Sequence, residues 1–255
     1  MACHSLDGMA TSRPDPVRAS SFGAVADDYD EFRPRPPAGL ADSLGTVDGA
    51  DAVDVAAGTG LLTRFLADHG ARVTAVEPDT RMAEVLASRS PGVRVVTGTA
   101  EALPLPDGSA DLVTVSSAWH WFDHDRAAAE FARVLRPGGR LVVLWNGVDY
   151  GSADWLAQLR QQVGARGAGD PSRRAVDLPA DLPFGPTTSE YHRWTWNRTV
   201  DEIAGLRGTY SGVLIDDPSL RDSLTDEVRA AALERLEDGQ VVLPMVCRTV
   251  WTVRT

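Results

Sequence analysis

The chain has 255 residues, of which 43% are apolar, and this is enough for one domain with a sizeable core. Its formal net charge is −11, from 36 acidic and 25 basic side chains, so its surface repels the phosphates of nucleic acids and of anionic membranes. No stretch holds the roughly 18 uninterrupted apolar residues that a membrane-spanning helix needs. We therefore expect neither nucleic acid nor a membrane as a partner.

The first segment, 1–20, lacks the apolar centre of a signal peptide, and we interpret it as a disordered tail. The two cysteines, Cys3 and Cys247, make no disulfide framework, so a reducing cytoplasm is the expected location. No metal site is expected. After the tail, we expect a short helix, a proline-rich turn and a second helix before residue 46.

From residue 50 to residue 146, short β-branched runs alternate with stretches of helical periodicity. This alternation is typical of an open parallel sheet covered by helices on both faces. The strands are expected at 52–57, 71–78, 93–100, 110–118 and 140–146, and the helices at 60–70, 80–90 and 123–139.

Beyond residue 146 the pattern weakens. We expect helices at 152–167 and 219–239, strands at 188–199 and 240–255, and a long loop at 168–186.

Neither an internal repeat nor an interdomain linker is visible in the sequence. We therefore predict a single domain over 21–255, with a core at 50–146 and a lid built from segments 21–49 and about 150–212.

Two glycines, Gly58 and Gly60, follow the first predicted strand and allow a tight turn that approaches a ligand closely. Glu77 ends the second predicted strand, where a carboxylate accepts the hydroxyl protons of a ribose. The third glycine of a dinucleotide-binding loop is replaced by Thr63. The pattern suits a nicotinamide dinucleotide or adenosine joined to another group.

Further stretches follow this loop in a fixed order and spacing: VDVAAGTGLLT, AVEPDTRM, GTAEALPLPDGSADLV, SSAWHWF and EFARVLRPGGRLVVLWN. Together they resemble the class I methyltransferases that use S-adenosylmethionine (SAM), in particular small-molecule members of type 11 similar to trans-aconitate methyltransferases. The resemblance covers residues 22–146 well and the later residues loosely. It implies a Rossmann-like α/β fold, with a seven-stranded, mostly parallel sheet and helices on both faces. It also implies SAM as cofactor and S-adenosylhomocysteine (SAH) as product.

The resemblance implies contacts to each part of the cofactor. Asp54 and the loop backbone would meet the methionine part, Glu77 the ribose and Met82 the adenine. Arg33, in the stretch YDEFRP, would pair with the methionine carboxylate. The complete set of expected cofactor residues is Tyr29, Arg33, Asp54, Ala56, Gly58, Gly60, Glu77, Met82, Thr99, Ala100, Glu101 and Ser116.

Three positions depart from the family pattern: Ala56 replaces a glycine, Thr99 an aspartate and Pro36 a tyrosine. Taken without the family, several of the expected contacts have a plainer interpretation. Asp54 suits a brace of the loop, and Met82 suits an ordinary core position.

The stretch SSAWHWF follows the fourth predicted strand, at the edge of the sheet where ligands bind. If it is extended, Trp119 and Trp121 share one side and His120 faces the other, which the resemblance places towards the cleft. His120 is the expected catalytic base for a hydroxyl acceptor, and a satisfied wall residue is the alternative. The expected substrate contacts are Trp119, Trp121, Trp145, Asn146 and Tyr210.

The sequence thus predicts methyl transfer from SAM to a small molecule whose identity it leaves open, as it does the oligomeric state. The main alternative is a protein that binds SAM without methylating, either a cyclase or a binding scaffold. An NAD-linked reductase is less favoured because of Thr63. A nucleic-acid methyltransferase is disfavoured by the net charge.

Overall fold

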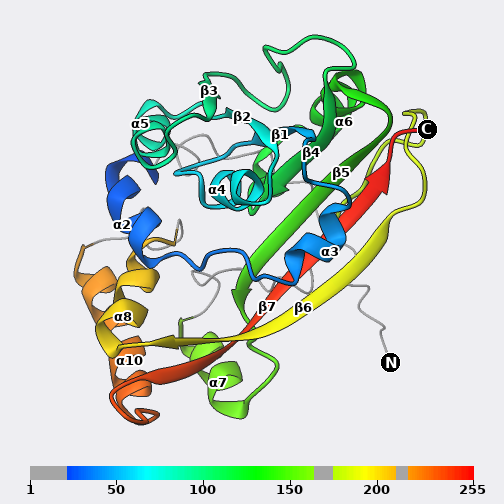
Figure 1. Ribbon diagram of the computed structural model, residues 1–255. Helices are drawn as coiled ribbons and strands as arrows, with labels where there is room; N and C mark the ends of the chain where they lie inside the picture. The colour runs from blue at the N-terminus through cyan, green and yellow to red at the C-terminus, as the bar shows by residue number, and fades with distance from the viewer. Residues whose placement is uncertain (1–21, 164–174, 211–217) are drawn as a thin grey trace, which may run out of the picture.

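The computed structural model describes residues 22–163, 175–210 and 218–255 (Figure 1). The predicted tail at 1–20 and the first part of the predicted loop, 168–174, lie outside these residues. The described part begins with the short helix η1 (Phe22–Val25).

A seven-stranded sheet runs through the described residues in the order β3-β2-β1-β4-β5-β7-β6 (Figure 1). Strands β1 to β5 are parallel, β7 is antiparallel to β5, and the edge strand β6 is antiparallel to β7. The strands are β1 (Asp51–Val55), β2 (Arg72–Val76), β3 (Arg94–Val96), β4 (Ala110–Ser116), β5 (Leu135–Val148), β6 (Thr188–Arg198) and β7 (Val241–Val253). The predicted Rossmann-like, mostly parallel α/β sheet is confirmed.

The helices of the described residues fall into two groups. Those between the parallel strands are α4 (Leu61–Asp68), α5 (Thr80–Arg89) and α6 (His124–Val134). Those outside the core are α2 (Ala26–Phe32), α3 (Leu40–Leu44), α7 (Asp154–Val163), α8 (Val200–Gly208) and α10 (Pro218–Leu233).

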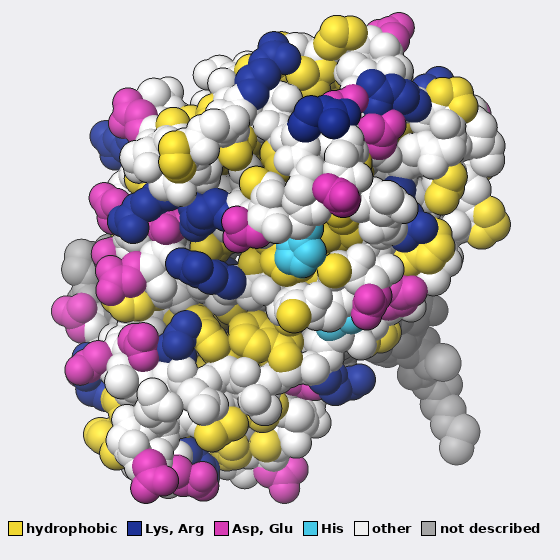
Figure 2. Space-filling model, viewed as in Figure 1, with side chains coloured by type: hydrophobic (Ala, Val, Ile, Leu, Met, Phe, Trp, Pro, Cys, Tyr) yellow, Lys and Arg dark blue, Asp and Glu magenta, His cyan; other side chains and the backbone are white. Residues whose placement is uncertain are grey.

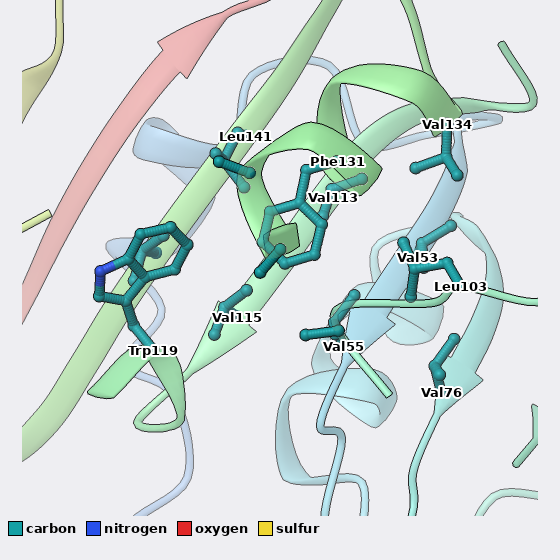
Figure 3. Close-up of a cluster of buried hydrophobic side chains, with 14 of the residues drawn as sticks. Val53, Val55, Val76, Leu103, Val113, Val115, Trp119, Phe131, Val134 and Leu141 are labelled. Carbon is teal, nitrogen blue, oxygen red and sulfur yellow. The ribbon is translucent and has the colours of Figure 1, made fainter. Parts of the chain in front are cut away.

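The sheet is buried on both faces because alternate residues of each strand point in opposite directions. On one face, Val53 and Val113 pack with Phe131 of α6 (Figure 3). On the other face, Ala52 and Leu112 pack with α3 and α4. The nearly continuous apolar runs of β1 and β4 in the sequence follow from this double burial.

A third apolar cluster joins α7, α8 and α10 to the ends of β5 and β7. Helix α8 begins after Thr199, whose hydroxyl accepts from the backbone of Glu202 while the Glu202 carboxylate accepts from the backbone of Thr199. The apolar pattern of the sequence did not single out this helix. In Figure 1, α2 lies between α5 and α8, so the N-terminal helix joins the core to the C-terminal helices.

Two local predictions are wrong. The strand predicted at 110–118 ends at Ser116, because Ser117 has a φ of 57° that an extended chain does not adopt. The next residues form the short 3-10 helix η2 (Trp119–Trp121), so the SSAWHWF stretch is not extended. Helix α6 ends at Val134 instead of continuing to residue 139, and β5 already starts at Leu135 with an irregularity opposite β4.

Among the described residues, none of the helices is both long and apolar enough to cross a membrane. On the face seen in Figure 2, side chains of both charges are interspersed. That face shows no broad basic patch of the kind that binds a nucleic-acid backbone.

Candidate functional site

A cleft with a volume of about 250 Å³ lies at the carboxyl ends of β1, β2 and β4. Ligands of open α/β sheets bind at this edge of the sheet. The side chains around it come from the core, from the N-terminal helices and from η2. The described residues that line it are Phe22, Tyr29, Ala56, Gly58, Glu77, Pro78, Asp79, Met82, Thr99, Ala100, Glu101, Ser116, Ser117, Ala118, Trp121 and Phe122.

The loop after β1 owes its shape to three residues with positive φ: Ala56, Gly58 and Gly60. A side chain at Gly58 would meet only the tip of Met82, at 3.9 Å, so this glycine leaves the cleft open. A side chain at Gly60 would lie 2.8 Å from Cγ of Leu86. Gly60 therefore serves the contact between α4 and α5 and does not line the cleft.

Glu77 is the buried charge of the cleft, with 6% of its surface exposed. Its Oε2 accepts from the backbone N–H of Gly58 at 2.7 Å, and its Oε1 accepts from that of Asp79 at 2.9 Å. Burial raises the pKa of Glu77 to about 7, while these two backbone donors favour its ionised form. The carboxylate is thus fixed in position, and each oxygen keeps a lone pair for a ligand.

Asp54 lies beneath the loop and not on the cleft wall. Its two oxygens accept from the hydroxyls of Thr63, at 2.6 Å, and Thr114, at 2.9 Å. Burial raises the pKa of Asp54 to about 6, against the effect of these hydrogen bonds. Asp54 therefore braces the loop against α4 and β4, and its expected contact with the methionine part stays a prediction.

Aromatic rings form much of the remaining wall. The Phe22 ring meets Tyr29 edge-on at 5.7 Å and Trp121 at 6.4 Å between ring centroids. Met82 is buried in α5, whose first turn is capped by the carboxylate of Asp79. An aromatic cover above a methionine suits a planar heterocycle such as adenine.

A smaller pocket adjoins the cleft and shares Tyr29, Ser116 and Ser117 with it. Arg33 lies on its wall. The Nε and Nη2 groups of Arg33 donate to the hydroxyl and the carbonyl of Thr209, at 2.9 and 2.8 Å. Arg33 pairs with no carboxylate of the described residues, so its charge is balanced only by neutral acceptors and by the rings of Tyr29 and Tyr210.

The structure brings most of the expected cofactor residues together. Nine of them line the cleft: Tyr29, Ala56, Gly58, Glu77, Met82, Thr99, Ala100, Glu101 and Ser116. Arg33 lies in the adjoining pocket, while Asp54 and Gly60 lie behind the wall.

The expected substrate residues are dispersed. Trp119 and Trp145 belong to the apolar core, with 1% and 4% of their surface exposed, so only Trp121 of the three tryptophans lines the cleft. Asn146 donates to the carbonyls of Pro34 and Arg35, which fastens the N-terminal segment to β5. Trp119 and Trp145 thus belong to the core, whereas Trp121 lines the cleft and Asn146 lines the adjoining pocket.

Tyr210 and His120 also lie away from the cleft wall. Tyr210 stands beside Arg33, with the guanidinium 4.4 Å from its ring centroid. The His120 ring tilts against Trp121 at 4.5 Å, so it touches the cleft through that neighbour.

Six of the described lining residues were not predicted from the sequence: Phe22, Pro78, Asp79, Ser117, Ala118 and Phe122. Phe22 precedes the predicted core, and only the fold carries it to the cleft. The sequence could have indicated Asp79, because an aspartate directly before the stretch TRM predicts the N-cap of a helix, two residues after Glu77.

The residues fit SAM. Glu77 is a fixed acceptor for ribose hydroxyls, Gly58 leaves space beside it, and the apolar wall of Met82 and Ala100 suits adenine. The pair of glycines followed by an acidic residue also occurs in dinucleotide-binding proteins, but Thr63 takes the place of their third glycine and instead bonds to Asp54.

Fold and cleft together define a Rossmann-like protein with a site for an adenosine cofactor. The model of the methyltransferase domain family matches residues 53–143. An uncharacterised methyltransferase of Mycobacterium tuberculosis is 39% identical, over 87% of this chain and 88% of its own length. A methyltransferase-like protein of Schizosaccharomyces pombe is 32% identical, over 76% of this chain and 79% of its own length.

A solved structure from Anaeromyxobacter dehalogenans, assigned as a type II methyltransferase, is 28% identical and has a TM-score of 0.60. It covers 88% of this chain, and 98% of its own chain is matched. The chain belongs to this methyltransferase family and is a SAM-dependent methyltransferase. The narrower resemblance to trans-aconitate methyltransferases stays a prediction.

Proposed function

We propose that the protein transfers the methyl group of SAM to a small molecule, and that the described cleft holds the cofactor. The observation that carries the proposal is Glu77, a buried carboxylate held by two backbone N–H groups beside the open Gly58. In this proposal Glu77 accepts from the ribose, while Met82, Ala100 and Trp121 enclose the adenine. Thr99, Glu101 and Ser116 border the cofactor, and Tyr29 covers it.

Bound SAM supplies a methyl group on a positively charged sulfur, which a nucleophile attacks without further activation of the methyl. The protein's contribution is to hold the nucleophile in line and to exclude water. In this proposal the rings of Phe22, Tyr29 and Trp121, which lie on the cleft wall, cover the bound cofactor and shield it from water. An acceptor that arrives ionised needs no base, whereas a hydroxyl acceptor needs one. His120, the base expected for that case, lies behind Trp121 and not on the cleft wall, so its role is tested below.

The first experiment is calorimetric titration of the protein with SAH and with NADH. We expect SAH to bind and NADH not to bind, and we expect Glu77→Ala to weaken SAH binding at least tenfold through the loss of a charge-assisted hydrogen bond. Glu84→Ala, at an exposed position of α5 outside the cleft lining, is the matched control and should leave the affinity unchanged. Binding of NADH without SAH contradicts the proposal.

The second experiment separates an enzyme from a binding scaffold. The protein is incubated with SAM and a library of small molecules, and each product is examined for the mass gain of one methyl group. Formation of SAH that depends on one acceptor supports methyl transfer. Tight SAM binding with no methylated product across the library favours the non-methylating alternative.

A further inference from the structure

The segment of η1 and α2, which carries two residues of the cleft wall, packs closely at both ends. At its start, a side chain added at Gly23 would lie 2.5 Å from Oδ1 of Asp79, the residue that caps α5. At its end, a side chain added at Gly205 of α8 would lie 2.8 Å from the ring of Phe32. Helix α2 is thus held between α5 and α8 (Figure 1).

Between these ends, Asp30 joins α2 to α4. It follows Tyr29, which lines the cleft, and it is 8% exposed, whereas the other acidic side chains of α2 are exposed. Its Oδ1 accepts from Nη2 of Arg64 at 2.5 Å, and the Arg64 side chain is 19% exposed. Because this ion pair is largely buried, salt screens it much less than a pair on the surface.

Arg64 has a second partner in the glycine loop. Its Nη1 donates to the carbonyl of Thr59 at 2.9 Å. The N–H of the same peptide group belongs to Gly60 and donates to the carbonyl of Ala57 at 3.0 Å. Both sides of this peptide group are therefore fixed, which holds the turn from Gly58 to Gly60. A guanidinium suits the double role because its N–H groups point in fixed directions.

Neither Asp30 nor Arg64 is among the described residues that line the cleft, so both act through their neighbours. Asp30 adjoins Tyr29, and Arg64 bonds to the loop that carries Gly58. A buried ion pair adds little net stability, because the desolvation of two charges offsets their attraction. Two apolar side chains would stabilise the fold equally well, but they would not hold the loop carbonyl. The arrangement therefore points to a role in positioning.

We propose that Asp30 and Arg64 are positioning residues of the cofactor site, and that their ion pair sets the rate at which the cofactor leaves. With the pair intact, Tyr29 is held over the cleft while the glycine loop is held beside it. Without the pair, α2 separates from α4 and the cleft opens. This inference rests on the proposed function and deepens it, because it names the contact that controls how long the cofactor stays bound.

The first test replaces the ion pair by apolar side chains of similar size. In Asp30→Leu/Arg64→Met, the directed hydrogen bonds are lost and no buried charge is left without a partner. We expect its free energy of unfolding in urea to stay close to that of the unchanged protein, while its SAH affinity in calorimetry falls by about tenfold. A folded variant with unchanged SAH affinity overturns the proposal.

The second test measures rates by stopped-flow tryptophan fluorescence, since Trp121 lines the cleft. Asp30→Asn removes the charge and keeps the shape, so SAH dissociation should become about fivefold faster, with little change in association. Arg64→Met loses both partners and should accelerate dissociation by about tenfold. Asp28→Asn, at an exposed position of α2, is the control and should change neither rate. Slower association with unchanged dissociation contradicts the proposal.

Asp30→Asn also decides the matter if the apolar variant does not fold, because it preserves the size and shape of the side chain. Urea unfolding of each variant reports whether it is folded. If the unchanged protein binds no SAH, the proposed function fails. If the unchanged protein binds SAH and the folded Asp30 and Arg64 variants release it at the same rate, this inference alone fails.

Discussion

Two buried carboxylates at the same loop have different surroundings. Asp54 is satisfied by threonine hydroxyls inside the protein, whereas Glu77 is satisfied by backbone N–H groups at the edge of the cleft. Hydrogen bonds favour the ionised form of both carboxyl groups, including one from the backbone of Thr63 to Asp54. Of the two, Glu77 lines the cleft, so it is the one placed to exchange a proton when a ligand binds.

The pH dependence of SAH binding should follow Glu77. Ribose hydroxyls donate to the ionised carboxylate, and the pKa of Glu77 in the free protein is raised to about 7. The affinity for SAH should be constant above pH 7 and should fall below it, approaching about a tenfold loss for each pH unit. Binding near pH 7 should release protons from Glu77 to the buffer. Calorimetry in two buffers of different ionisation enthalpy measures the number of protons released on binding.

Glu77→Gln is the control for this prediction. It should bind SAH more weakly, with an affinity that does not change with pH.

The free energy of unfolding depends on the protonation of Glu77 in the opposite direction. The raised pKa means that the folded state holds the proton more tightly, so this group's contribution to stability decreases as the pH rises from about 4.5 to about 7.

His120 is not among the described residues that line the cleft, and it packs against Trp121, which is, so we expect a positioning role. With the acceptor found by the mass-gain screen, His120→Ala should raise the acceptor KM severalfold and lower kcat by less than tenfold, because the Trp121 ring loses its neighbour. The measurement is the pH profile of kcat for both proteins. A hundredfold loss of kcat together with loss of the acidic limb identifies His120 as a base instead.

The glycine loop is one element with two functions. Gly58 and Gly60 both have positive φ, so alanine at either position carries a strain of about 1 kcal/mol. At Gly60 the new methyl would also overlap Leu86, whereas at Gly58 it would enter the cleft.

The alanine variants at Gly60 and Gly58 should therefore lose different properties, the first mainly stability and the second mainly SAH affinity. Gly60→Ala should lower the free energy of unfolding by about 2–4 kcal/mol, with a smaller effect on SAH affinity once folded. Gly58→Ala should cost about 1 kcal/mol of stability and weaken SAH binding at least tenfold. Urea unfolding and SAH titration of both proteins check this, and equal losses in both measurements would contradict the division of roles.

At the scale of the whole molecule, the N-terminal segment joins the core to the C-terminal helices. Tyr29 lines the cleft, Arg33 bonds to Thr209 after α8, and Asn146 of β5 holds the carbonyls of Pro34 and Arg35. A ligand that contacts Tyr29 therefore stabilises contacts that reach α8.

Hydrogen exchange should show this coupling. SAH should slow amide exchange in α2 (26–32) and, through Arg33 and Thr209, in α8 (200–208). In Arg33→Ala the protection of α2 should remain and that of α8 should be lost. The exposed Arg35 is a control, because Arg35→Ala keeps the backbone carbonyl that Asn146 contacts and should leave both unchanged. Equal protection of α8 in the Arg33 variant would show that the segments respond independently.

The amino-acid sequence by itself determined the alternation of strands and helices and the position of the cofactor loop. These features are local: β1 and β4 are continuous apolar runs because both faces of the sheet are covered, and Glu77 follows the loop at a fixed spacing. The family resemblance of these stretches, carried over residue by residue, predicted nine residues that line one cleft.

Only the tertiary structure decided which side chains face the cleft and which support it. Spacing cannot show that Asp54 is enclosed by Thr63 and Thr114, because Thr114 lies sixty residues away. Nor can it show that Trp119 turns into the core, since the turn depends on Ser117 leaving the extended conformation. The contact of Arg33 with Thr209 spans 176 positions of the chain, and packing between the N-terminal and C-terminal segments alone brings these residues together.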